Sequence, residues 1–122
     1  MMIEIEKILN SIQRAFIGKK LNLQDEKKLQ SDICTAFESL DIPHAREVRL
    51  DNGIVDFMIG GLAIEVKIRS RASAMSIYRQ LERYTNDERV EAVLLITSHT
   101  MNIPETINAK PAYLLRLGRT QL

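Results

Sequence analysis

A glycine-centred segment at residues 53–68, GIVDFMIGGLAIEVKI, has the pattern of a buried β-hairpin that is interrupted by ionisable side chains. Gly60 and Gly61 predict the turn of this hairpin, because both central positions of a type I′ turn require a positive φ. Ile59 and Leu62 then pair across the two strands. The partner of every other residue follows by counting outward, and the alternation of side chains assigns each one to a face.

Counting outward places Asp56 directly opposite Glu65. These two residues share one face with Lys67. The other face is entirely apolar and consists of Val55, Phe57, Ile59, Leu62, Ile64 and Val66. Directly opposed residues have Cβ atoms about 4.5–5.5 Å apart, and two carboxylates at that separation destabilise a sheet unless a positive group lies between them. A divalent cation fits this position; the alternative is a solvated sheet face, where a Glu opposite a Lys would be the more favourable pair.

Length and composition are those of a folded globular domain. The chain has 122 residues, of which 45% are hydrophobic and 27% are charged, as is typical of one domain with a modest core. We expect residues 1–122 to form a single domain, with an amphipathic N-terminal helix at 1–18 and a core at 22–117. The net charge of +1 disfavours a high-affinity, sequence-blind nucleic-acid coat, so contact with nucleic acid would depend on local charge.

The single cysteine, Cys34, argues against an internal disulfide framework and fits a reducing compartment. Because it falls within a helical apolar pattern, we interpret it as a buried thiol rather than a nucleophile.

No apolar run approaches membrane-spanning length, and the N-terminus lacks the basic-then-apolar order of a signal peptide, so we expect a cytoplasmic protein without a membrane partner. His44 and His99 have no second metal-type ligand at the short spacings of a zinc site, which leaves both outside the predicted site.

Apolar periodicity predicts two helices before the hairpin. The first stops near Gly18, and its apolar stripe would either cover the sheet of its own chain or form the interface of a homodimer. Asn22 followed by Asp25 resembles a capping box that opens the second helix. This second helix must end before Pro43.

The rest of the chain predicts an α/β domain in which short turns separate the first three strands. The predicted strands cover residues 45–50, 53–59, 62–68, 90–97 and 112–117. A helix at 73–87 lies between the third and fourth strands, and a turn or short helix begins at Pro104. The strand at 90–97 is apolar enough to be covered on both faces. The resulting order is α-α-β-β-β-α-β-β.

Polar residues occur on these elements in a distinctive order: an acidic residue on an early helix, an Asp on one strand, Glu-x-Lys on the next strand and Gln-x-x-x-Tyr on the following helix. These residues are Glu26, Asp56, Glu65, Lys67, Gln80 and Tyr84. Their order resembles the motif of the PD-(D/E)xK nuclease superfamily, in its branch with a Gln-x-x-x-Tyr motif, over residues 22–97. The proline that precedes the Asp in the superfamily is replaced by Val55. The resemblance implies a restriction-endonuclease-like fold, a mixed β-sheet flanked by helices, and hydrolysis of DNA.

Hard oxygen ligands without a thiolate or imidazole suit Mg²⁺ or Mn²⁺, and Asp56 and Glu65 would be those ligands. The resemblance adds the main-chain carbonyl of Val66 to the metal site. It assigns Lys67 the role of orienting the attacking water and stabilising charge on the phosphate. The implied products carry a 5′-phosphate and a 3′-hydroxyl.

The remaining motif residues have two interpretations each. Glu26 would complete the metal shell or hold a second ion, but a glutamate in the first turn of a helix also stabilises the helix dipole. Gln80 and Tyr84 lie on one helical face and would position the DNA backbone or the metal-bound water. Tyr84 is equally compatible with a core residue whose hydroxyl reaches the surface.

Four arginines, Arg69, Arg71, Arg79 and Arg83, cluster between the third strand and the following helix. Arg69 and Arg79 are predicted to contact DNA phosphates. The alternative is that these arginines lie on a solvated face, which needs no function.

Three functions remain open at this point. The first is a Mg²⁺- or Mn²⁺-dependent deoxyribonuclease that acts on DNA, and the second is a catalytically inactive copy of the same fold that binds nucleic acid or a protein partner. The third is an assembly subunit whose first helix docks on a partner. Substitution of Asp56 distinguishes the first two functions. It should abolish cleavage by a nuclease, whereas it should leave the affinity of an inactive binding module largely intact.

Overall fold

The computed structural model describes residues 2–69 and 72–118, so Arg71 of the predicted arginine cluster lies outside the described residues. The helices and strands follow one another in an α/β arrangement. In chain order they are α1 (Met2–Phe16), α2 (Glu26–Ser39), β1 (Ala45–Leu50), β2 (Gly53–Ile59), β3 (Leu62–Lys67), α3 (Ala74–Tyr84), β4 (Ala92–Thr97), β5 (Thr106–Ile107) and β6 (Lys110–Arg116).

The strands form a mixed sheet in the order β1-β2-β3-β4-β6-β5. Two tight turns make β1, β2 and β3 an antiparallel meander. α3 connects β3 to the parallel strand β4, and the segment that contains β5 connects β4 to β6, which is also parallel to it. The α/β class and the mixed sheet predicted from the sequence are therefore confirmed.

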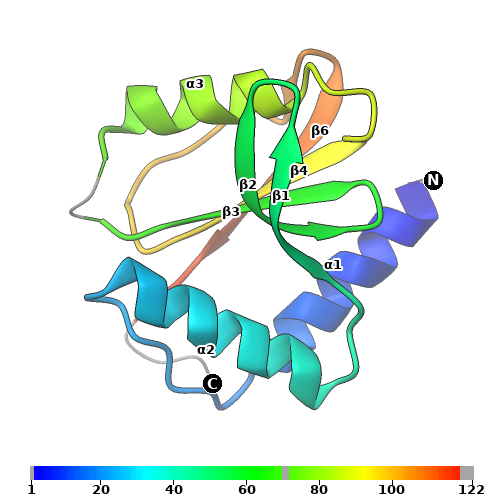
Figure 1. The fold of residues 1–122 in the computed structure, drawn as a ribbon. Coiled ribbons are helices and arrows are strands. Elements are labelled where there is room, and N and C mark those ends of the chain that lie inside the picture. Colours follow the sequence, from blue (N-terminus) through cyan, green and yellow to red (C-terminus); the bar gives the residue numbers. More distant parts are fainter. Residues whose placement is uncertain (1, 70–71, 119–122) are drawn as a thin grey trace.

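Helices cover both faces of this sheet (Figure 1). α1 and α2 pack on one face, where Ile5, Ile12 and Phe16 of α1 are buried. The apolar stripe of the first helix therefore covers the sheet of its own chain, which was one of the two predicted alternatives. α3 packs on the other face through buried residues that include Ile77 and Leu81. β4 is buried along its whole length between the two layers, as its continuous apolar pattern predicts.

The hairpin has the predicted register but a different turn. Ile59 pairs with Leu62 as expected. Gly60 has a positive φ of 56°, whereas Gly61 does not, so the turn has the φ pattern of type II′ rather than type I′. Both turn types match the twist of the flanking strands, which explains why the register survives the change.

The predicted apolar face is wrong at one position. Val55 pairs with Val48 and packs against the α3 layer, whereas Phe57 pairs with Arg46 and packs against α1 and α2. Between these two pairs Glu47 has a φ of 51°, which is rare for a residue other than glycine. The irregular backbone at Glu47 in β1 thus coincides with the point in β2 where the alternation of faces assumed from the sequence pattern breaks.

The second helix begins later than the capping-box pattern indicates. Asp25 is the N-cap, and its side chain accepts a hydrogen bond from the main-chain N–H of Lys28 at 3.1 Å. Asn22 instead forms a local turn, because its Oδ1 accepts from the main-chain N–H groups of Gln24 and Asp25 at 2.9 and 2.8 Å. This correction places Glu26 in the first turn of α2.

The C-terminal part of the sheet also departs from the predicted order. β5 is a two-residue strand where the sequence suggests only a turn or short helix, so the described residues have the order α-α-β-β-β-α-β-β-β. The short β5 pairs only with β6 and has too few residues to show an alternating pattern. α3 ends at Tyr84 rather than Asp87, because the chain turns there into the connection to β4.

Asp87 joins this connection to the β1–β2 turn. Its carboxylate is 2% exposed and accepts hydrogen bonds from the main-chain N–H of Asp51 at 2.9 Å and from Arg89 Nε and Nη2 at 3.0 and 2.8 Å. Arg89 also donates to the carbonyl of Arg49 at 3.0 Å. The hydrogen bonds from Arg89 hold the pKa of Asp87 well below its usual range. The network fixes the hairpin that delivers Asp56 to the sheet.

We expect Asp87→Ala to lower the free energy of unfolding by about 2–3 kcal/mol, because a buried charged acceptor is lost and the N–H of Asp51 is left without its partner. Urea denaturation followed by circular dichroism measures this change. Glu88→Ala, at an exposed neighbouring position, should change it by no more than about 0.5 kcal/mol. Equal destabilisation by the two variants would contradict the role given to Asp87.

Candidate metal centre

Asp56 bridges β2 and β3 where their main-chain pairing ends. The last pair of the ladder is Phe57 with Ile64, and beyond it Asp56 Oδ2 accepts a hydrogen bond from the main-chain N–H of Val66 at 2.8 Å. A side-chain carboxylate therefore replaces a main-chain carbonyl as the acceptor for β3. The predicted direct pair of Asp56 and Glu65 lies one step past the end of the ladder.

Glu65 is the buried centre of the group, with 2% of its surface exposed. Its Oε2 forms an ion pair with Lys67 Nζ at 3.2 Å, and its Oε1 lies 3.0 Å from the hydroxyl of Tyr84. Lys67 therefore supplies part of the positive charge that the sequence pattern assigns to a cation. When both are ionised, Asp56 and Glu65 carry two negative charges, and Lys67 supplies only one positive charge.

Tyr84 connects Glu65 to the start of β2. The residue is buried, and its hydroxyl lies inside the protein rather than at the surface. Gln80 Nε2 donates to this hydroxyl at 2.9 Å, and the hydroxyl lies 2.8 Å from the carbonyl of Ile54. The phenol has one proton, so it donates either to Ile54 or to Glu65. If Glu65 is protonated, its carboxyl donates to Tyr84 and both contacts are satisfied together.

α2 brings Glu26 to the same end of β3. The helix begins at Glu26, and Glu26 Oε1 accepts a hydrogen bond from the main-chain N–H of Ile68 at 3.1 Å. The negative charge of Glu26 also raises the pKa of Asp56. Of the two interpretations of Glu26, these contacts favour a place in the acidic group, and its position in the first turn still stabilises the helix dipole.

Burial shifts both central carboxyl groups toward the protonated form. Desolvation, aided by the charges of Glu26 and Glu47, raises the pKa of Asp56 to about 6. Desolvation and the charge of Asp56 raise the pKa of Glu65 to about 8, although Lys67 and Tyr84 act in the opposite direction. Clustered carboxyls with raised pKa values are typical of sites where a cation or a proton provides the missing positive charge.

Glu47 adds a further negative charge near Asp56, and no sequence pattern singles it out. It lies on β1 between the pairs Arg46–Phe57 and Val48–Val55 and has a φ of 51°. Its charge contributes to the raised pKa of Asp56. Residues in such sparsely populated backbone conformations cluster at functional sites. β1 contains other exposed charged residues, so in the sequence Glu47 looks like an ordinary solvated glutamate. No local pattern therefore marks it as a neighbour of Asp56.

The predicted DNA-contacting arginines lie near the two ends of the connection between β3 and α3. Arg69 follows Ile68, and its main-chain N–H donates to Ser98 Oγ at 2.9 Å. Arg79 is on α3, next to Gln80. Both side chains are exposed, which is compatible with phosphate contact and with ordinary solvation alike.

The donor atoms of the acidic group are carboxylate oxygens, the kind that hard divalent cations prefer. Asp56 and Glu65 are carboxylates, and neither a thiolate nor an imidazole takes part in the contacts of this group, which suits Mg²⁺ or Mn²⁺ rather than Zn²⁺. The resemblance assigns the third ligand to the carbonyl of Val66. The N–H of the same residue is the group that anchors Asp56, so its main chain lies beside one of the two carboxylates.

Glu65 should make the protein less stable as the pH rises. The folded pKa is about 8, whereas the ordinary value is 4.5, so between these values the folded chain holds a proton that the unfolded chain has released. The free energy of unfolding therefore falls across this interval. We expect Glu65→Gln to remove most of the fall and to be more stable than the wild type at the upper end by about 2–4 kcal/mol.

Denaturation curves at a series of pH values measure this dependence. Glu105→Gln, which changes an exposed glutamate, serves as the matched control and should keep the wild-type slope. An unchanged slope in Glu65→Gln would show that this carboxyl titrates near its ordinary pKa.

Comparison with known proteins adds no assignment to these geometric observations. No family model, curated protein sequence or solved structure gives a significant match to this chain. None of the helices in residues 2–69 and 72–118 combines the length and apolar character needed to cross a membrane. The case for a function therefore rests on the acidic group and on the elements that hold it.

Proposed function

We propose that this protein is a metal-dependent nuclease that hydrolyses DNA phosphodiester bonds and has a restriction-endonuclease-like fold. The observation that carries the proposal is the convergence of Glu26, Asp56, Glu65 and Lys67 at one end of β3. They come from one helix and two strands, in the order of the motif that the sequence resembles. A sheet face that served only for solvation would not bury a glutamate, because burial of a charge is unfavourable unless it is paired.

The arrangement of the sheet supports the same proposal. The resemblance implies a mixed sheet flanked by helices, with the Asp and the Glu-x-Lys on neighbouring strands. Here β2 and β3 are neighbouring antiparallel strands, β4 is parallel to β3, and helices cover both faces. The motif residues on α2 and α3 therefore approach β3 from opposite sides of the sheet.

Asp56 and Glu65, with the carbonyl of Val66, would hold Mg²⁺ or Mn²⁺. Such an ion, when bound, polarises the scissile phosphate and lowers the pKa of a water molecule. It would also draw Glu65 into the ionised form, which is otherwise disfavoured up to a pH of about 8. Metal binding should therefore release a proton when it takes place below that pH.

The chain's own residues would position the reacting groups. Lys67 holds its ammonium group beside Glu65, where it would donate hydrogen bonds to the attacking water and to the phosphate oxygens. Tyr84, supported by Gln80, keeps Glu65 in one orientation. In the hydrolysis, the water oxygen bonds to phosphorus and the bond from phosphorus to the 3′-oxygen breaks. The 3′-oxygen takes up a proton, which leaves a 5′-phosphate and a 3′-hydroxyl.

A specific observation favours a second candidate function, an inactive nuclease-fold module that binds nucleic acid or a protein partner. Every oxygen of Glu65 already has a partner within the chain, because Lys67 and Tyr84 contact its two oxygens. A satisfied network of this kind stabilises a fold without a metal. Arg69 and Arg79 would then contact phosphates in a binding surface that performs no chemistry.

Cleavage of a labelled panel of single-stranded, duplex, flapped and junction DNA distinguishes these two functions. We expect cleavage by the wild type with Mg²⁺ or Mn²⁺, none with EDTA, and none by Asp56→Ala. Lys67→Ala should keep Mg²⁺ binding, measured by calorimetry, and lose cleavage by about 10²–10³-fold, as expected for loss of a group that stabilises charge in the transition state.

Matched substitutions at exposed positions provide the controls. Glu6→Ala and Lys7→Ala change exposed residues of α1 that are not among the contacts of the site, and both should cleave like the wild type. Wild-type cleavage by Lys67→Ala would show that the site is misplaced. DNA binding without cleavage by folded wild-type protein, unchanged in Asp56→Ala, would identify the inactive module.

A further inference from the structure

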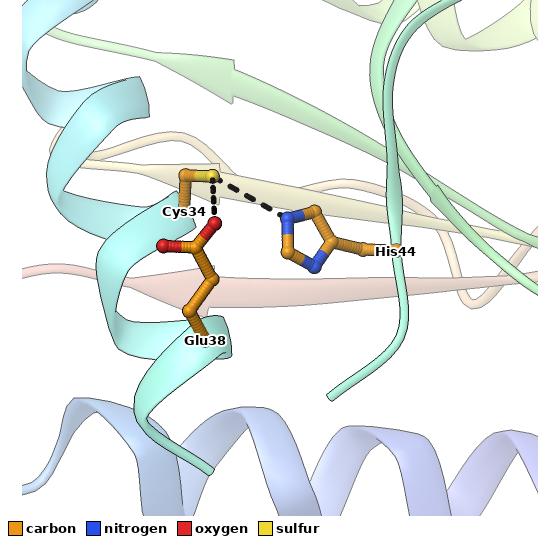
Figure 2. A group of neighbouring side chains, drawn as sticks. All are labelled: Cys34, Glu38 and His44. Atoms are coloured by element: carbon orange, nitrogen blue, oxygen red, sulfur yellow. Dashed lines mark hydrogen bonds between the residues drawn. The ribbon is translucent and has the colours of Figure 1, made fainter. Parts of the chain in front are cut away.

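A second group of potential ligand atoms lies outside the acidic site, at the junction of α2 and β1 (Figure 2). Cys34 and Glu38 are one helical turn apart on α2, and His44 immediately precedes β1. The chain reverses direction after α2, which brings His44 back against the helix. Cys34 Sγ lies 3.4 Å from His44 Nε2 and 3.7 Å from Glu38 Oε2, and the three ligand atoms all lie within 4.8 Å of one another.

The imidazole of His44 is held in the orientation that a metal ligand requires. Nδ1 lies 2.9 Å from the carbonyl of Ile42, and a carbonyl can only accept, so Nδ1 donates and, in the neutral ring, Nε2 has the free lone pair. That lone pair faces Cys34. The ring also packs edge-on against Phe37 and Phe57, with centroid distances of 5.2 and 5.9 Å. A main-chain carbonyl behind the histidine is the usual outer partner of metal-binding imidazoles.

The two separations that involve Cys34 Sγ are close to those of tetrahedral coordination. Zn²⁺ binds sulfur at about 2.3 Å and imidazole nitrogen or carboxylate oxygen at about 2.0–2.2 Å, so ligand pairs that include the sulfur are separated by about 3.6 Å in a tetrahedral site. The observed distances from Sγ, 3.4 Å to His44 and 3.7 Å to Glu38, lie on either side of this value. All three ligand atoms lie within 4.8 Å of one another, so one ion can contact all of them once the side chains adjust.

The charges around the group are partly balanced. Thiolate and carboxylate together would supply two negative charges; burial and the charge of Glu38 raise the pKa of Cys34, and the positive charge of Arg46 offsets only part of this rise. The guanidinium of Arg46 lies over the ring of Phe57 at 5.6 Å. Glu38 is exposed, and Cys34 and His44 are half-buried, so an ion can reach the group from solvent.

We propose that Cys34, Glu38 and His44 form a transition-metal site, which binds Zn²⁺ or a similar borderline divalent cation with solvent in the fourth position. Sulfur and imidazole ligands select this class of ion over Mg²⁺ or Mn²⁺, so the site is chemically distinct from the acidic group. The bound ion would clamp the C-terminal half of α2 to the start of β1. The proposal stands independently of the nuclease function.

Titration of the reduced full-length protein with Co²⁺ tests the site by a spectroscopic signal rather than by activity. We expect one equivalent of Co²⁺ to produce a thiolate-to-cobalt charge-transfer band together with the strong visible bands of tetrahedral cobalt. Zn²⁺ should displace both. Cys34→Ser should lose the charge-transfer band, and His44→Gln and Glu38→Gln should bind Co²⁺ more weakly by about tenfold or more.

Two substitutions provide matched controls. His99→Gln removes the other histidine of the chain, and Asp56→Ala disrupts the acidic group; both should retain the wild-type spectrum. Circular dichroism establishes that each variant is folded, and Glu38→Gln, at an exposed position, provides the test if Cys34→Ser does not fold. A folded wild type without a charge-transfer band, or identical cobalt spectra in wild type and Glu38→Gln with equal affinity, would overturn the proposal.

Discussion

The hydrogen bond from the main chain of Val66 to the carboxylate of Asp56 determines much of the geometry of the acidic group. It ends the β2–β3 ladder and still keeps the two strands in contact. Because the strands stay together, Glu65 and Lys67 remain close to Asp56 at the end of the sheet. The carboxylate of Asp56 thus takes the place of a main-chain acceptor for β3 and is held at the end of the sheet.

Burial of Glu65 determines which protonation state of its carboxyl group the folded protein favours. Lys67 and Tyr84 satisfy its oxygens, but desolvation and the neighbouring Asp56 still raise its pKa to about 8. Burial therefore favours the neutral carboxyl, and the ionised carboxylate would be stabilised by a nearby cation. A buried carboxylate that is only partly paired lowers the stability of the fold. A second positive charge, in addition to Lys67, would remove this loss.

Local patterns predicted the strands and helices well, because alternation, periodicity and glycine turns depend on neighbouring residues. The limits of β1 and the register of Ile59 with Leu62 follow from such signals. The features that were missed depend on tertiary contacts. Val55 leaves the predicted face beside the irregular backbone of Glu47 on the neighbouring strand, and the proximity of Cys34 to His44 depends on how the chain returns from α2. The convergence of Glu26 and Asp56 was suggested only by the resemblance, since no local pattern specifies which helix end meets which strand.

The unusual backbone of Glu47 has a consequence for association between molecules. β1 is an edge strand, and edges with a regular row of free main-chain groups are templates for pairing with a strand of another chain. A residue with a φ of 51° in the middle of β1 breaks that row, and the exposed charges of Arg46, Glu47 and Arg49 surround the break. This irregular backbone conformation therefore protects the open edge of the sheet against edge-to-edge aggregation.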